Sequence, residues 1–132
     1  MKIIRNIKNL QESIVNIPNL GFVPTMGGLH KGHLKLIKKS INRSQKTLVS
    51  IYVNPTQFNK KKDFSKYPRN TKKDLQILKR QKVDFVFLPK TGEIYKRQIR
   101  KNIKIHKKKN VLCGKFRKGH FEGVIDVIDR FL

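Results

Sequence analysis

The sequence has little cysteine and no long apolar run, and each shortage excludes a class of protein. Cys113 is the only cysteine, so the chain cannot form an internal disulfide, and the cytoplasm is the expected compartment. No apolar stretch approaches the ~20 residues that span a bilayer, and the N-terminal residues lack the apolar segment of a signal peptide. We therefore expect a soluble protein with no membrane partner.

Acidic residues are scarce and basic residues abundant: 8 Asp and Glu stand against 32 Lys and Arg, which gives a formal net charge of +24. Such a charge attracts polyanions, because Lys and Arg that neutralise phosphates release counterions. A basic, non-specific nucleic-acid or polyanion binder is therefore one alternative. However, the basic residues are spread through the whole chain and accompany abundant Ile and Asn, which favours a drift in composition over specific nucleic-acid binding.

One stretch combines a strand, a tight turn and a helix. Residues 20–23 are apolar and predict a buried strand that ends at Pro24, and the two adjacent glycines Gly27 and Gly28 follow. A helical pattern continues from there. Glycine lets the backbone approach a ligand closely, and the first N–H groups of a helix have no partners inside it. The turn is therefore a candidate site for an anion such as phosphate.

Two histidines stand three residues apart at this helix start. If residues 29–33 are already helical, His30 and His33 lie on one side of the helix, and both can donate hydrogen bonds to a bound anion. A metal site is an alternative use of the pair. No further Cys and His cluster with ligand spacing accompanies it, so we assign no metal ligands.

The rest of the chain predicts strands that alternate with helices. In chain order we expect a short strand or arm and a weak helix over 1–19, a strand at 47–53, an exposed connection or flap at 59–66, a helix after 70, a strand at 83–88 and an amphipathic helix at 123–132. Thr71 is the expected N-cap of the helix after 70, with Asp74 as its capping acid. Strands apolar on both faces are typical of a parallel sheet, so residues 54–58 should reach the same edge as the glycines.

Four motifs follow one another in the order found in one enzyme family. They are Pro-Thr-Met-Gly at 24–27 with His-x-Gly-His at 30–33, and the segments 49–58, 63–69 and 117–124. Together they resemble the pantoate–beta-alanine ligase (pantothenate synthetase) family of the nucleotidyltransferase superfamily. The resemblance implies an α/β fold with a Rossmann-like parallel sheet and flanking helices. It also implies an AMP-forming ligase that condenses pantoate with beta-alanine to pantothenate through a pantoyl adenylate.

The resemblance further implies the ligands and the residues that hold them. ATP is a substrate, Mg²⁺ accompanies it, and the family assembles as a homodimer. The implied ATP site comprises Met26, Gly27, Gly28, Leu29, His30, Lys31, Gly32 and His33. His33 would act as the proton donor in a hydrogen bond to the phosphates, with His30 beside it. The residues implied to hold pantoate and beta-alanine are Pro24, Thr25, Asn54, Gln57, Arg117 and His120.

The sequence departs from the family's pattern in two places. Cys113 stands where the family commonly has a glutamate. Family members also continue with a Gly-Glu-Lys-Asp loop and a smaller C-terminal domain, which these 132 residues do not contain. We therefore expect 1–132 to be a partial N-terminal ATP- and pantoate-binding domain without the C-terminal domain, as a fragment, a degraded reading frame or one piece of a split enzyme. Its ligase activity alone is expected to be poor or absent.

Overall fold

The computed structural model describes residues 1–95, 127, 128 and 130, and the chain divides into two compact units. The first unit comprises Met1–Val53 and Pro68–Glu93, and the second comprises Asn54–Tyr67 and Ile94–Leu132. No helix in the described ranges is both long enough and apolar enough to cross a membrane.

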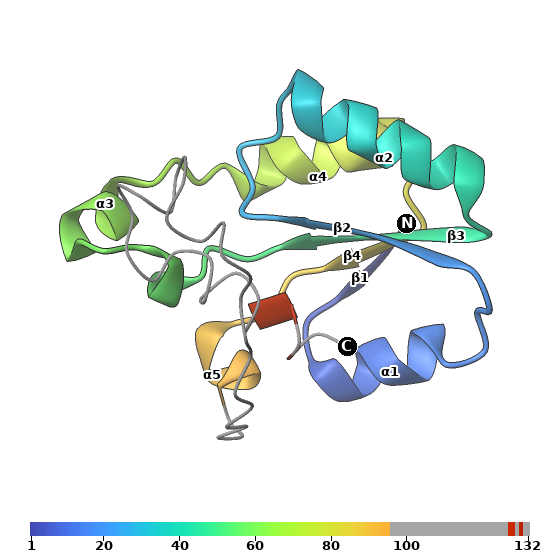
Figure 1. The fold of residues 1–132 in the computed structure, drawn as a ribbon, viewed down its shortest axis with the longest axis horizontal. Helices are drawn as coiled ribbons and strands as arrows, with labels where there is room; N and C mark the ends of the chain where they lie inside the picture. Colours follow the sequence, from blue (N-terminus) through green and yellow to red (C-terminus); the bar gives the residue numbers. More distant parts are fainter. Residues whose placement is uncertain (96–126, 129, 131–132) are drawn as a thin grey trace, which may run out of the picture. The chain divides into compact units, whose positions relative to one another are not determined.

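Four parallel strands form the sheet of the first unit (Figure 1). Their order across the sheet is β1 (Lys2–Ile4), β4 (Phe85–Phe87), β3 (Lys46–Ile51) and β2 (Leu20–Thr25). β3 pairs with β2 along its whole length and with β4 through three residues. The predicted α/β fold with a Rossmann-like parallel sheet is confirmed, and the apolar, β-branched segment that predicted a doubly covered strand forms the central strand β3.

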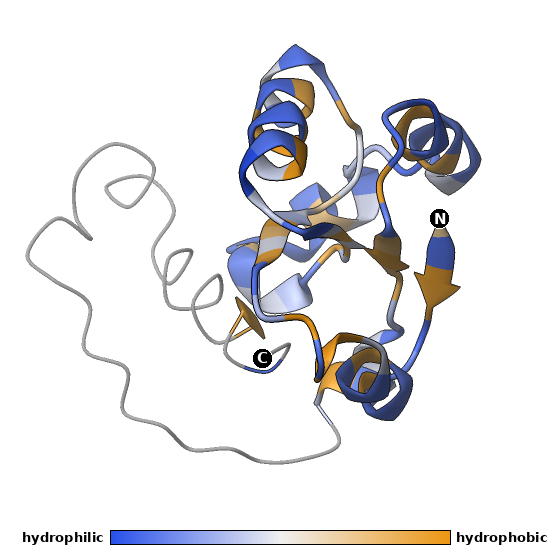
Figure 2. Cartoon of the chain, turned by 90° about the vertical axis from the view of Figure 1, so that its right-hand side faces the viewer, coloured by the Kyte–Doolittle hydropathy of each residue, from blue (hydrophilic) through white to orange (hydrophobic). Residues whose placement is uncertain are grey.

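Helices cover both faces of this sheet (Figure 1). α2 (Lys31–Arg43) and α4 (Thr71–Arg80) lie on one face, and α1 (Ile7–Ile14) lies on the other. The buried cluster on the α2 and α4 face consists of Val23, Ile37, Val49, Ile51, Leu78, Val83 and Val86. Figure 2 shows hydrophobic residues on the strands and hydrophilic residues on much of the helix surfaces. This division follows the 3.6-residue period of the helices.

β2 differs from its prediction, because it does not end at Pro24 and is not buried on both sides. It runs on to Thr25 as an edge strand, and the Thr25 carbonyl accepts the Tyr52 N–H at 3.0 Å, toward the β3 side. Neighbouring residues of a strand direct their backbone groups to opposite sides, so Pro24 faces the outer edge. A proline there removes no hydrogen bond from the sheet, which is why the strand continues through it.

Two later elements of the first unit, α4 (Thr71–Arg80) and β4, also differ from their predicted starts. Asn70, not Thr71, is the N-cap of α4, and its side chain accepts the Lys73 N–H at 3.1 Å. β4 starts only after Asp84, whose carboxylate accepts the Thr47 N–H at 2.9 Å. The residue expected to cap α4 from within, Asp74, is instead buried on the inner side of that helix.

The second unit contains a helix where an exposed connection or flap was predicted. It begins with the 3-10 helix η1 (Pro55–Gln57), followed by α3 (Lys61–Lys66). The rings of Phe64 and Tyr67 stand edge-on to Phe58, with centroids 5.6 and 5.5 Å from it. Such aromatic packing stabilises a lysine-rich segment that by composition alone resembled a solvated loop.

The last stretches are described only in part. α5 (Thr91–Ile94) carries the chain from the first unit into the second. Within the helix predicted at 123–132, Val127, Ile128 and Arg130 are described, and all three are helical. The Arg130 guanidinium lies 4.6 Å from the centre of the Tyr95 ring.

Candidate functional site

The glycine turn, residues 26–30, joins the end of β2 to the start of α2 in the first unit. Gly27 and Gly28 have φ angles of +78° and +61°, a region that strongly favours glycine. A Cβ atom at Gly27 would lie 2.9 Å from Oδ2 of Asp74, whereas a Cβ at Gly28 would meet nothing within 4 Å. Gly27 is therefore required by conformation and by space, and Gly28 by conformation alone.

A buried carboxylate from α4 holds this turn. The two oxygens of Asp74 accept the N–H groups of Gly28 and Leu29, both at 2.9 Å, and the residue is only 3% exposed. Sequence patterns did not predict this contact. One signal was present: Asp74 precedes the core residue Leu78 by four positions, which places both on the same face of the helix.

Thr25 holds the other end of the turn. Its hydroxyl accepts the Gly27 N–H at 3.2 Å and donates to the Ser50 carbonyl at 2.8 Å. Together with Asp74, it engages the backbone N–H groups of three successive residues, 27–29. These three N–H groups are therefore engaged within the protein, and donors for an anion must come from the helix start that follows.

His30 and His33 form a capping box at the start of α2. His30 is the N-cap, and its Nδ1 accepts the Gly32 N–H at 3.1 Å. Nδ1 of His33 accepts the His30 N–H at 3.3 Å, and the ring centroids are 4.1 Å apart. The helix begins at Lys31, so the condition that residues 29–33 are all helical is not met, but the two imidazoles lie side by side as expected.

The capping box determines which ring nitrogen carries the proton. A nitrogen that accepts a backbone N–H is unprotonated, so in the neutral form each ring bears its proton on Nε2. Partial burial, and then the neighbouring His30, lower the pKa of His33 below its ordinary value, while the charge of Asp74 acts in the opposite direction. At neutral pH, His33 is therefore a neutral hydrogen-bond donor through Nε2.

Three donors remain at this helix start. The capping box engages the His33 backbone N–H with the His30 side chain, so within the described part of the chain the groups with no hydrogen-bond partner are the Nε2–H groups of His30 and His33 and the backbone N–H of Lys31. Such donors at the start of a 13-residue helix favour an anion, because the helix dipole adds partial positive charge there. No three His, Cys, Asp or Glu side chains of the described residues gather in a way that would hold a metal ion.

The other predicted residues of the first unit lie in the turn or next to it in the sequence. Leu29 is half-buried and packs against the core cluster, and Met26 is half-buried as well. Lys31 and Gly32 are exposed in the first turn of α2. Pro24 is exposed at the outer edge of β2, in a shallow hollow of about 370 Å³ between β2 and α2.

The remaining predicted residues lie in the second unit or outside the described residues. Asn54 and Gln57 are 0% and 5% exposed, so Gln57 is not the solvated residue that a loop position suggests. Oδ1 of Asn54 accepts the Thr56 N–H at 3.2 Å and the Tyr95 hydroxyl at 2.8 Å. Arg117 and His120, like Cys113, fall in the range 96–126, outside the described residues.

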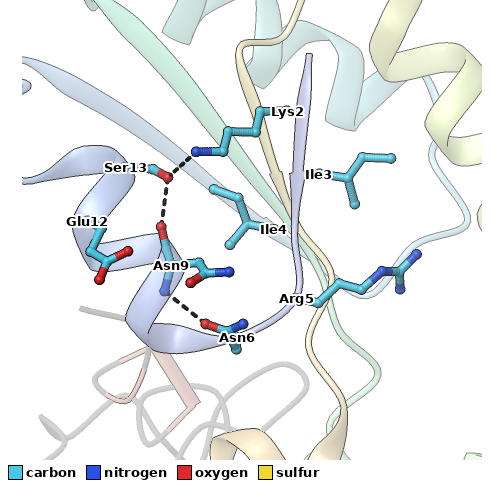
Figure 3. Close-up of a pocket in the computed structure, with 8 residues that line it drawn as sticks. All are labelled: Lys2, Ile3, Ile4, Arg5, Asn6, Asn9, Glu12 and Ser13. Atoms are coloured by element: carbon cyan, nitrogen blue, oxygen red, sulfur yellow. Dashed lines mark hydrogen bonds between the residues drawn. The ribbon is translucent and has the colours of Figure 1, made fainter.

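A second hollow, of about 390 Å³, lies between β1 and α1 and contains none of the predicted site residues (Figure 3). Several of its polar groups bind one another. Nζ of Lys2 donates to the Ser13 hydroxyl at 2.9 Å, and that hydroxyl donates to the Asn9 carbonyl at 2.7 Å. These contacts fasten α1 to the edge of the sheet, so the glycine turn is the stronger candidate site.

Comparison with known proteins points to one family. The family model described as pantoate-beta-alanine ligase matches residues 2–132. The pantothenate synthetase of Endomicrobium trichonymphae is 44% identical over 132 residues, which is 97% of this chain and 47% of the relative. That of Helicobacter acinonychis is 43% identical over 134 residues, 98% of this chain and 49% of the relative. The chain thus spans about half the length of these relatives.

Solved structures give the same result. A pantoate-beta-alanine ligase from Francisella tularensis, complexed with beta-gamma ATP and beta-alanine, superposes with a TM-score of 0.90 at 41% identity. The match covers 100% of this chain and 52% of that one. A pantothenate synthetase from Thermus thermophilus has a TM-score of 0.85 at 32% identity, over 98% of this chain and 47% of its own.

Proposed function

The chain belongs to the pantoate–beta-alanine ligase family, and from that premise we propose that it carries the nucleotide part of a site that joins pantoate to beta-alanine using ATP. First, a pantoate carboxylate oxygen attacks the α-phosphorus of ATP and pyrophosphate leaves. Then the beta-alanine amine attacks the carbonyl carbon of pantoyl adenylate, loses a proton, and AMP leaves. Neither step requires a protein nucleophile, so the protein positions two anions and stabilises charge on the phosphates.

The capping box of His30 and His33 is the observation that carries this proposal. It leaves two Nε2–H donors beside the free backbone N–H of Lys31 at the start of α2. The phosphates of ATP suit this set, with His33 as donor to them and Lys31 as an exposed positive charge nearby. A bound anion would also raise the pKa of His33, because a nearby negative charge favours the protonated ring.

The substrate assignments follow from the family and remain proposals. The Francisella relative is complexed with beta-gamma ATP and beta-alanine, which supports ATP and beta-alanine as ligands here. We assign pantoate and beta-alanine to the residues Pro24, Thr25, Asn54, Gln57, Arg117 and His120. We also propose that 1–132 is part of an N-terminal ATP- and pantoate-binding domain. Pantoate, the homodimer and the cytoplasm stay predictions, and none of the relatives named above supports the nucleic-acid alternative.

The donor set at the glycine turn does not fit Mg²⁺ held by protein ligands. Mg²⁺ prefers carboxylate, phosphate and water oxygens. The carboxylate at the turn is Asp74, and its oxygens already accept the Gly28 and Leu29 N–H groups. We therefore route no step through a protein-held ion at this turn, and propose that Mg²⁺ accompanies the nucleotide on phosphate oxygens.

The experiment uses His33→Asn, because an asparagine oxygen can replace the Nδ1 acceptor while the Nε2–H is lost. Since the chain spans about half of its relatives, the separately expressed remaining half of a close relative is added. Pyrophosphate release from ATP and pantoate should then fall at least about a hundredfold, as when one donor to a developing negative charge is removed. The KM for beta-alanine should change little.

Asn42→Ala is the matched control, because Asn42 is exposed on the same helix. It should release pyrophosphate at the unmutated rate. Unchanged release by His33→Asn would refute the role of His33. An unmutated chain that binds no ATP would refute the proposed function itself.

A further inference from the structure

Asp74 is a buried charge that the two proposed reaction steps do not use. It lies 46 positions from Gly28 in the sequence, on α4, and is 3% exposed. In the described part of the chain no basic side chain pairs with it; the ion pair found there joins Lys46 to Asp84. A buried charge is unfavourable unless hydrogen bonds compensate it, and here both bonds come from the glycine turn.

We propose that Asp74 is a positioning residue of the nucleotide site, whose carboxylate holds the glycine turn and so directs phosphate binding to the His30–His33 pair. The inference rests on the proposed function, because it assigns a role within the same site. By accepting the Gly28 and Leu29 N–H groups, Asp74 withdraws them from the phosphates. The donors left are those of the capping box and the first turn of α2.

The contacts around the turn explain how one carboxylate can place two imidazoles. Leu29 donates its N–H to Asp74 and packs against the core cluster. It immediately precedes His30, the N-cap of α2. Gly27 passes so close to Oδ2 of Asp74 that a Cβ atom there would lie 2.9 Å away. The turn therefore has little room to shift while Asp74 is in place.

The test compares Asp74→Asn with Asp63→Asn in the full chain. Both changes remove one negative charge, the first on the buried side of α4 and the second on the exposed side of α3. Asparagine offers one acceptor oxygen and one N–H₂ group, so one of the two turn N–H groups loses its partner. We expect the Kd for ATP to rise at least about tenfold in Asp74→Asn, as for loss of a charge-assisted hydrogen bond. Asp63→Asn should leave the Kd unchanged.

The pKa of His33, followed by NMR, distinguishes lost positioning from a lost fold. The groups that act on His33 are His30 in the turn and Asp74 on α4. Because the charge of Asp74 raises the His33 pKa, Asp74→Asn with the turn retained should lower that pKa further. A turn that has unfolded should instead return it upward toward 6.5. The two outcomes differ in sign.

Amide exchange in the unmutated chain completes the test and does not depend on the variant folding. Slowly exchanging Gly28 and Leu29 amides that shift less on ATP addition than the Lys31 amide would support the proposal. Freely exchanging Gly28 and Leu29 amides, or an unchanged Kd in a folded Asp74→Asn, would overturn it. If the unmutated chain binds no ATP, the proposed function fails, while amide exchange and the His33 pKa still test whether Asp74 holds the turn.

Discussion

The glycine turn and the η1 segment each follow a parallel strand, yet their backbones are held in different ways. The turn after β2 is held by Asp74, a charged side chain 46 positions from Gly28. η1 is held by its own N-cap, because Asn54 accepts the Thr56 N–H two residues on, at 3.2 Å. The difference indicates that the turn depends on the packing of α4 against the sheet, whereas η1 depends first on a local, neutral contact.

Gly27→Ala should show the dependence of the turn on α4 most strongly. The change forces a side chain into a left-handed conformation and against Oδ2 of Asp74, 2.9 Å from the new Cβ atom. We expect the free energy of unfolding to fall by about 3 kcal/mol, as backbone strain and weakened hydrogen bonds combine. Urea unfolding followed by circular dichroism measures it.

Gly28→Ala is the matched control for this comparison. It has a similar positive φ, but its Cβ atom would meet nothing within 4 Å. Only the conformational strain remains, which amounts to about 1 kcal/mol. Equal losses in the two variants would show that contact with Asp74 adds nothing at Gly27.

Asn54→Ala tests the local support of η1 and should have a smaller effect. Asn54 is fully buried, and its Oδ1 accepts both the Thr56 N–H and the Tyr95 hydroxyl. Removing this acceptor should lower the free energy of unfolding of the second unit by about 2 kcal/mol. Tyr95→Phe removes one of these donors and should lower it by about 1 kcal/mol. A loss in Asn54→Ala no larger than that in Tyr95→Phe would contradict the double role of Asn54.

The smallest expected effect is a pH dependence of the stability of the first unit. The pKa of His33 is lowered in the folded chain, so the unfolded chain binds this proton more readily. The contribution of His33 to stability is therefore fully present above the ordinary pKa of 6.5 and decreases as the pH falls below it. Thermal unfolding above and below pH 6.5 should show the decrease, and His33→Asn should remove it. An equally steep dependence in His33→Asn would assign the effect to another group.

The sequence predicted the sheet, the helices that flank it and the glycine turn, because these depend on local patterns. Hydrophobic periodicity is sufficient for α2 and β3, and the two glycines mark the turn. Sequence patterns could not show that the turn's N–H groups are engaged, since their acceptor Asp74 comes from a distant helix. They also missed α3, because Phe58, Phe64 and Tyr67 stabilise that segment through contacts that its lysine-rich composition conceals.

Pro24 also bears on how chains of this protein meet one another in solution. The outer edge of a strand presents a row of N–H and C=O groups that can template the addition of a strand from another molecule. At Pro24 this row lacks a donor, so an incoming strand loses one hydrogen bond near the C-terminal end of β2. Pro24 does not interrupt its own strand, but it disfavours the addition of another strand, and so aggregation, at this edge.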